Sequence, residues 1–289
     1  MESGEFGVVE DTLVLARLDG VLRVLKVSDL ATFKKAGYLV EVYGVDEGLN
    51  DRFGLLEDIL EHNCSEVRVL HVRGHGSISL CSNHIVPVVE PRSLLVEKRA
   101  RDLKPGDYML SFVKRAPRSV DYTEHTEEKT ICPSSIEELA LTMWTLRLSG
   151  VLSSLAYNRI CLKTYSERGR FKLEKIPIGF FESLKQHLRE VSRSSRYCRH
   201  VATHLGSRRN VSKHIALLAL RDLMRVASGK SISVSSREAL ENLSRLVTSN
   251  LYVVRVSDIE VRREKRRSFA ISADKAAYVF VGLAPLLVG

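Results

Sequence analysis

The sequence predicts an α+β protein in which both chain ends build one β-rich domain around an inserted mixed domain. Strand-like patterns fill residues 1–112 and return in residues 251–289, while helical patterns dominate between them. Charge changes at similar places: residues 1–112 carry 13 basic and 18 acidic side chains, whereas residues 151–250 carry 19 and 7. These shifts indicate an insertion, and we expect parts at 7–113, 114–250 and 251–289.

The first part consists of short runs rich in Val, Leu and Ile, separated by turn residues such as Asp19-Gly20. We expect strands over 8–18, 21–27, 38–43, 67–71, 77–80, 85–89 and 108–113. The spacing of the apolar residues predicts one helix, over Leu55–His62. Many short strands with frequent turns indicate a sandwich or barrel-like β unit.

The middle part reads mainly as helices. Serines and acidic residues at the start of Ser135–Leu148 indicate a capped helix. Further helices are expected over Pro177–Val191, Ser212–Ala227 and Ser236–Val247, with short strands at 159–165 and 231–235. The last part returns to strands, over 252–261 and 277–283.

Two classes of protein are disfavoured. No apolar run approaches the roughly 20 residues that a membrane helix needs, and the N-terminus lacks the pattern of a secretion signal. The five cysteines are scattered and contain no C-x-x-C pair, which favours reduced thiols over a disulfide framework or a zinc site. We therefore expect a cytoplasmic monomer without a metal or a membrane partner.

Three clusters of motifs lie in the outer parts, in a fixed order. The opening cluster is Val9–Leu15, which contains Glu10-Asp11-Thr12. The middle cluster is Ile78–Pro87 followed by Ala100–Tyr108, and the closing cluster is Val256–Val261 followed by Ala277–Val281. Together these clusters resemble the opening, middle and closing blocks of the intein, or Hint, splicing fold. The resemblance implies an all-β horseshoe built from the two chain ends.

The resemblance also implies autocatalysis on the chain itself, without a cofactor. In that family the first residue attacks the preceding carbonyl, and a His on a central strand protonates the departing amide nitrogen. His84 matches that His, and Asp258 matches an Asp that assists the second transfer. Cys81 stands where the family usually has Thr, and we interpret it as a small buried residue rather than a second nucleophile.

Both junction positions depart from the family pattern. Counting back from Asp11, the nucleophile position is Gly7, which has no reactive side chain. A final His-Asn pair is expected after Leu286-Leu287-Val288, where Gly289 stands instead. Neither the acyl shift nor Asn cyclisation can proceed without these groups. We therefore expect a silenced splicing element, engineered or naturally decayed, whose partners are the flanking host segments (exteins).

The insert contains an internal repeat. Residues 139–150 are echoed by residues 218–229, and both copies run from Leu-Ala-Leu to Ser-Gly. This order resembles the LAGLIDADG homing endonucleases, which implies an α/β domain with two such helices packed on a pseudo-two-fold axis. It also implies one metal-binding acid at the end of each helix. Ser149 and Ser228 occupy those positions here.

A hydroxyl supplies no negative charge for the Mg²⁺ that an active nuclease would use. We therefore expect an insert that does not cleave DNA but binds double-stranded DNA through its basic residues. The residues expected to do so are Arg159, Lys163, Arg168, Arg170, Lys172, Arg208, Arg209 and Lys213.

Two alternatives stay open. In the first, the chain is a DNA-binding module for which the Hint part serves as a scaffold. In the second, the insert is an active homing endonuclease that uses other acids, such as Asp222 on the second repeat helix.

Overall fold

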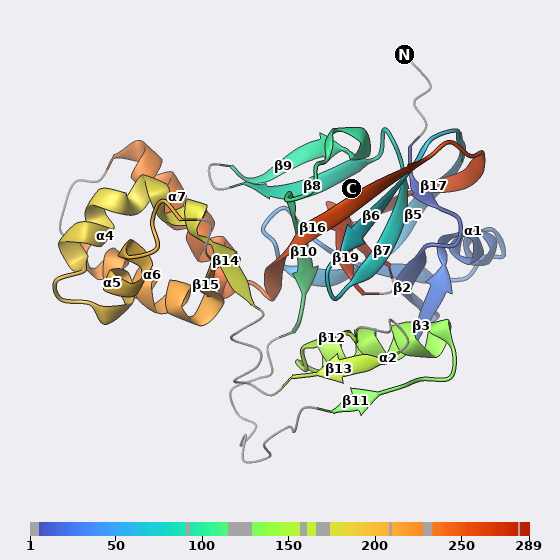
Figure 1. The fold of residues 1–289 in the computed structure, drawn as a ribbon. Helices are drawn as coiled ribbons and strands as arrows, with labels where there is room; N and C mark the ends of the chain where they lie inside the picture. The colour runs from blue at the N-terminus through green and yellow to red at the C-terminus, as the bar shows by residue number, and fades with distance from the viewer. Residues whose placement is uncertain are drawn as a thin grey trace.

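A large antiparallel sheet contains strands from both ends of the chain (Figure 1). The structure, a computed structural model, describes residues 6–90, 93–114, 129–156, 161–165, 174–207, 210–227, 233–282 and 284–289. The expected α+β class is confirmed. The strands of the outer parts are β1 (Val8–Val9), β2 (Leu13–Leu18), β3 (Val21–Lys26), β4 (Val40–Val45), β5 (Asp51–Cys64), β6 (Val67–Val72), β7 (Gly76–Cys81), β8 (Ile85–Glu90), β9 (Leu94–Arg99), β10 (Tyr108–Phe112), β16 (Leu251–Arg262), β17 (Arg266–Ala273), β18 (Tyr278–Val281) and β19 (Leu286–Val288).

The two ends of the chain interleave within this sheet. Strand β1 lies between β7 and β17, β10 pairs with β16, and β18 pairs with β2, β4 and β19. Strands β2 and β3 form a hairpin whose turn residues Asp19 and Gly20 have φ values of 48° and 84°. Asp-Gly suits such a turn because both central positions require positive φ. The outer parts therefore form one structural unit.

Two local predictions in the first part are wrong. Residues 55–62, expected as a helix, belong to the 14-residue strand β5. The first residues of β5, up to Leu55, pair with β4 and the rest pair with β17, so successive backbone partners override the helical spacing. Leu55 and Leu60, which a helical face would bury, are 41% and 52% exposed. Conversely, the helix α1 (Val27–Lys35) was not expected.

The insert divides into two separate groups of elements. The first group contains β11 (Thr130–Ile131), α2 (Ile136–Leu148), β12 (Ser153–Leu155) and β13 (Leu162–Thr164). The second group forms a helical lobe that contains β14 (Lys175–Pro177), η2 (Ile178–Leu184), α4 (Lys185–Val191), α5 (Arg196–Ala202), β15 (Asn210–Ser212), α6 (Lys213–Ala227) and α7 (Val234–Thr248). The lobe continues the main sheet, because β14 pairs with β15 and with β16.

The expected pseudo-two-fold pairing of the repeat helices is not what the structure shows. Helix α2 carries the first repeat and lies against β3 and β12, whereas α6 carries the second and packs among α4, α5 and α7 (Figure 1). Buried side chains explain the position of α2. The indole of Trp144 donates to the Gly282 carbonyl at 3.3 Å, and the Arg147 guanidinium donates to Ser111 Oγ at 2.7 Å. Helix α2 is thereby fixed to the outer domain.

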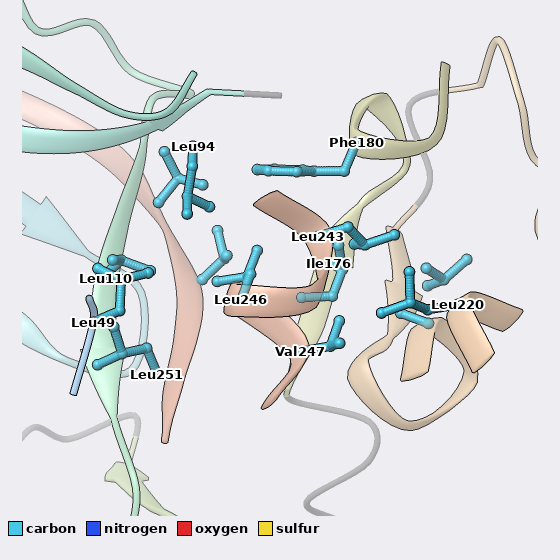
Figure 2. Packing of buried hydrophobic residues seen from close by; sticks show 14 of the residues in the cluster. Leu49, Leu94, Leu110, Ile176, Phe180, Leu220, Leu243, Leu246, Val247 and Leu251 are labelled. Carbon is cyan, nitrogen blue, oxygen red and sulfur yellow. The ribbon is translucent and has the colours of Figure 1, made fainter. Parts of the chain in front are cut away.

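An apolar core joins the helical lobe to the outer domain. Figure 2 shows Leu246 of α7 between Leu110 of β10 and Ile176 of β14. All three side chains are buried, with exposed fractions of 0%. Burial of this kind contributes about 1.5–3 kcal/mol for each large apolar side chain. None of the described helices combines the length and apolar character that crossing a bilayer requires.

The expectation of reduced thiols throughout is wrong for one pair. Cys132 and Cys161 form a disulfide. They directly follow β11 and precede β13, two antiparallel strands in which Ile131 lies opposite Leu162. The pairing therefore brings the two cysteines opposite each other across 29 residues of sequence, a proximity that their spacing alone does not reveal.

Candidate active site

The position expected for the nucleophile and the last residue of the chain meet at one place in the fold. The Gly7 amide donates a hydrogen bond to His84 Nδ1 at 3.2 Å. The Gly289 amide donates to the carbonyl of Ile85 at 3.1 Å. His84 directly precedes β8 and Ile85 is its first residue, so Gly7 and Gly289 each donate to one residue of a single dipeptide.

His84 is held by its own backbone in the centre of this arrangement. Its amide donates to the Cys81 carbonyl at 2.9 Å, and its carbonyl accepts from the Ala100 amide at 2.8 Å. The side chain is 4% exposed, and burial lowers the pKa of the imidazole to about 4. The ring is therefore neutral at pH 7, with Nδ1 as the acceptor towards Gly7. Within the described residues, Nε2 has no hydrogen-bond partner.

Gly7 fits its position because it has no side chain. Its φ is 114°, a conformation that residues with a Cβ rarely adopt. A Cβ here would lie 2.5 Å from the carbonyl carbon and 2.7 Å from the amide nitrogen of Phe269. Strand β17 therefore occupies the space that a nucleophilic side chain would enter.

Ser268 is a site residue that sequence reasoning missed. Its hydroxyl donates to the carbonyl oxygen of Phe6 at 2.9 Å, and this carbonyl precedes Gly7. The Ser268 side chain is fully buried, on the strand that lies beside β1. Nothing in the sequence distinguishes this serine, because its role depends on the pairing of β17 with β1.

Cys81 lies close to the same centre in sequence and in space. Its amide donates to the Gly7 carbonyl at 3.0 Å, and its side chain is fully buried beside Val9, Val67 and Val69. This environment agrees with the interpretation of Cys81 as a small buried residue.

Asp258 lies elsewhere on the sheet. It is exposed on β16, where its register partner is His71, and His71 in turn pairs with Ser77 of β7. Ser77 is four residues from Cys81, which corresponds to about 13 Å along a strand. The strand beside Gly7 is β17, in which Val8 pairs with Phe269. The structure therefore does not bring Asp258 to the other predicted site residues.

The predicted endonuclease positions do not form a metal site in the described residues. Ser149 is exposed at the end of α2, and Ser228 lies outside the described residues. Asp222 accepts a hydrogen bond of 2.6 Å from Ser195 Oγ, which also caps helix α5. Mg²⁺ requires several oxygen ligands, preferably carboxylates. The exposed Ser149 hydroxyl and the Asp222 carboxylate, which already accepts from Ser195, do not provide them.

Only two of the predicted DNA-binding residues lie in the described part of the chain. Lys163 is exposed on β13, beside the ring of Tyr165. Lys213 is 4% exposed, and its ammonium donates to the carbonyls of Ser249, at 2.7 Å, and Leu251. The prediction for Lys213 is therefore wrong, since the buried ammonium holds the end of α7. Arg159, Arg168, Arg170, Lys172, Arg208 and Arg209 lie outside the described residues.

A cavity of about 1050 Å³ lies between the outer domain and the insert. Its walls include Arg73 from the β6–β7 turn, Lys175 of β14, Arg255 of β16 and Tyr165. No carboxylate lines it among the described residues. The lining therefore contains three cationic side chains, which suit an anionic partner.

Comparisons with known proteins gave the following similarities. No family model matches the chain. The chain is similar to the replication factor C small subunit of Methanocaldococcus jannaschii, at 31% identity over 117 residues. The match covers 37% of this chain and 6% of that protein, so the chain spans a small fraction of the relative's length.

Three similar solved structures are inteins. The transcription factor IIB Mvu mini-intein is 10% identical with a TM-score of 0.48, and the match covers 97% of this chain and 98% of that chain. An intein from a hyperthermophile is 11% identical with a TM-score of 0.45, over 98% of this chain and 99% of that chain. The TvoVMA intein is 10% identical with a TM-score of 0.43, over 99% of this chain and 98% of that chain.

Proposed function

We propose that this chain is an intein, a self-processing protein-splicing element whose junction residues have been lost. The observation that carries the proposal is the meeting of Gly7 and Gly289 at His84–Ile85. Splicing joins the two host segments, so the ends of a splicing element have to lie side by side. Here 281 intervening residues separate two positions that contact neighbouring groups of one dipeptide.

The position of His84 suits the first step of such a reaction. Its Nδ1 atom lies 3.2 Å from the Gly7 nitrogen, which is the leaving group when the Phe6–Gly7 bond is exchanged. Because burial lowers the pKa of His84 to about 4, the ring is a neutral acceptor at pH 7. A neutral imidazole can take the proton of an attacking thiol or hydroxyl and then transfer it to the departing nitrogen.

Two positions lack the reacting groups that the reaction needs. Gly7 offers neither thiol nor hydroxyl, and Gly289 occupies the position expected for His. The two losses affect different steps, so they can be repaired and tested separately. The C-terminal repair is the easier one, because the nearest atoms to a Cβ at Gly289 belong to Ile85 and lie 3.3–3.5 Å away, against 2.5–2.7 Å at Gly7.

The decisive experiment restores the C-terminal junction. The chain carries Gly289→His, followed by an appended Asn and a reporter protein. We expect release of the reporter within hours, measured on a gel and by mass spectrometry. The matched control replaces the appended Asn by Ala and should stay intact. Equal reporter release from both chains, or none from either, contradicts the proposal.

A second experiment tests the complete reaction. It adds Gly7→Cys, an N-terminal host segment and a Cys after the appended Asn. Ligated host segments are the expected product, and the unaltered chain in the same host is the inert control. Since Phe269 crowds position 7, we expect ligation to be much slower than release of the reporter.

The cavity supports a second role, binding of double-stranded DNA. Arg73, Lys175 and Arg255 line it from three different elements, and Lys163 lies beside its wall residue Tyr165. Three cationic side chains around one cavity suit contact with a phosphate backbone. Because Ser149 is neutral and Asp222 is committed to Ser195, we propose that the insert binds DNA without cleaving it.

A titration with duplex DNA at two salt concentrations tests this role. Arg73→Ala should reduce the slope of log affinity against log salt by about one, as expected for the loss of one phosphate contact. Lys35→Ala, an exposed lysine on α1, is the control and should leave the slope unchanged. Absence of binding at low salt contradicts the role. Specific plasmid cleavage with Mg²⁺ contradicts the inactive insert.

A further inference from the structure

Both polar atoms of the Phe6–Gly7 peptide group are held by buried side chains. The amide of Gly7 donates to His84 Nδ1 at 3.2 Å, and the carbonyl oxygen of Phe6 accepts from Ser268 Oγ at 2.9 Å. The next carbonyl is held differently, because Gly7 O accepts from the backbone amide of Cys81. One peptide group at the start of β1 is thus removed from the backbone ladder and contacted by two functional side chains.

The surroundings of Ser268 determine where its hydroxyl proton points. Ser268 lies on β17, fully buried, opposite Val9 on one side and His62 on the other. Its Oγ lies 2.9 Å from the Phe6 oxygen and 3.4 Å from the His62 oxygen. A hydroxyl has one proton to donate, and the shorter contact is to Phe6. A negative charge on the Phe6 oxygen would strengthen that preference.

We propose that Ser268 is the oxyanion-stabilising residue of the N-terminal acyl shift. This inference rests on the proposed function and adds a catalytic residue to it. The thiol or hydroxyl of a nucleophile at position 7 adds to the Phe6 carbonyl carbon, and the oxyanion that forms accepts the Ser268 hydrogen bond. The carbon–nitrogen bond then breaks. The proton of the nucleophile passes through His84 to the departing nitrogen, so the step needs no further reactant.

The arrangement has the geometry that such stabilisation requires. The donor is a fully buried side chain within hydrogen-bond distance of the oxygen where charge develops, and the residue that carries this oxygen, Phe6, is half-buried. Loss of one oxyanion donor typically lowers the rate by about 10²–10³. Asp258 does not compete for this role, because its strand β16 pairs with β6 and not with β1.

The kinetic test uses the full chain with Gly7→Cys, Gly289→His, an appended Asn, and a reporter at each end. Added thiol should release the N-terminal reporter by capturing the thioester. Ser268→Ala should slow this release by about 10²–10³ while C-terminal release continues. Ser272→Ala, an exposed serine on the same strand, is the matched control and should leave both rates unchanged. Equal N-terminal rates for the two variants overturn the inference.

A spectroscopic test needs no change at position 7. The chain with a ¹³C-labelled Phe6 carbonyl is compared by infrared spectroscopy with its Ser268→Ala and Ser272→Ala variants. Loss of the hydrogen bond should move the labelled band to higher frequency in Ser268→Ala alone. An unmoved band overturns the inference even if the Gly7→Cys chain does not fold. Failure of the C-terminal release, by contrast, is evidence against the proposed function and not against the Ser268–Phe6 contact.

Discussion

Gly7→Ala should destabilise the chain more than an equivalent change at another glycine with positive φ. Both Gly7 and Gly20 have positive φ, at 114° and 84°. Placing Ala in such a conformation costs roughly 1–2 kcal/mol. At Gly20 no other atom lies within 4 Å of the added Cβ, whereas at Gly7 the Cβ would lie 2.5–2.7 Å from three backbone atoms of Phe269.

Strand β17 cannot move away at low cost, because it pairs with β5 from Arg266 to Ala273. Overpacking against such a fixed neighbour costs about 1–3 kcal/mol, so Gly7→Ala should cost about 2–5 kcal/mol in total. The assay is urea unfolding of the two variants and the unaltered chain, followed by circular dichroism. If the two variants lose the same free energy of unfolding within about 0.5 kcal/mol, the steric argument is refuted.

Three other predictions concern buried polar groups and the disulfide. His84 has a pKa of about 4 in the folded chain against 6.5 ordinarily, so the unfolded chain takes up a proton first as pH falls. The free energy of unfolding should therefore be unaffected by His84 above pH 6.5 and should fall by up to about 3 kcal/mol as pH drops to 4. His84→Gln should flatten this part of the pH profile. Lys213→Met should lower the free energy of unfolding by about 1–3 kcal/mol, because it leaves the Ser249 carbonyl without its hydrogen bond. The salt dependence of DNA affinity should not change, and a reduced slope would contradict the buried role of Lys213. Reduction of the Cys132–Cys161 disulfide should lower the free energy of unfolding by about 3–4 kcal/mol, as expected for cysteines 29 residues apart. In Cys132→Ser, the reductant should no longer change the temperature of thermal unfolding.

Much of the outer domain could be predicted from local pattern. Turn residues such as Asp19-Gly20 marked the hairpin ends, and runs of β-branched residues marked most strands. The failure at β5 has a physical reason. Leu55, Leu56, Ile59 and Leu60 have helical spacing, but this segment pairs with β4 and then with β17, and the strand pairing overrides that spacing.

The insert was predicted less well, because its sequence repeat indicates two helices but not which elements each helix packs against. The Leu-Ala-Leu pattern correctly indicated α2 and α6. However, Trp144 and Arg147 fix α2 to the outer domain, and no local pattern reveals the partner of a buried aromatic or guanidinium group. For the same reason, Lys213 looked like a surface cation although it bonds two backbone carbonyls.

The sequence by itself determined the α+β class, the motif order that singled out His84, and the glycines at positions 7 and 289. These are properties of residue type and short spacing, which a linear chain displays directly. Only the tertiary structure decided that Gly7 and Gly289 meet at one dipeptide, that Ser268 contacts the Phe6 carbonyl, and that Asp258 lies away from them. Such contacts depend on which strands pair and in which register, and a shift of one residue would put Arg267 or Phe269 in the place of Ser268.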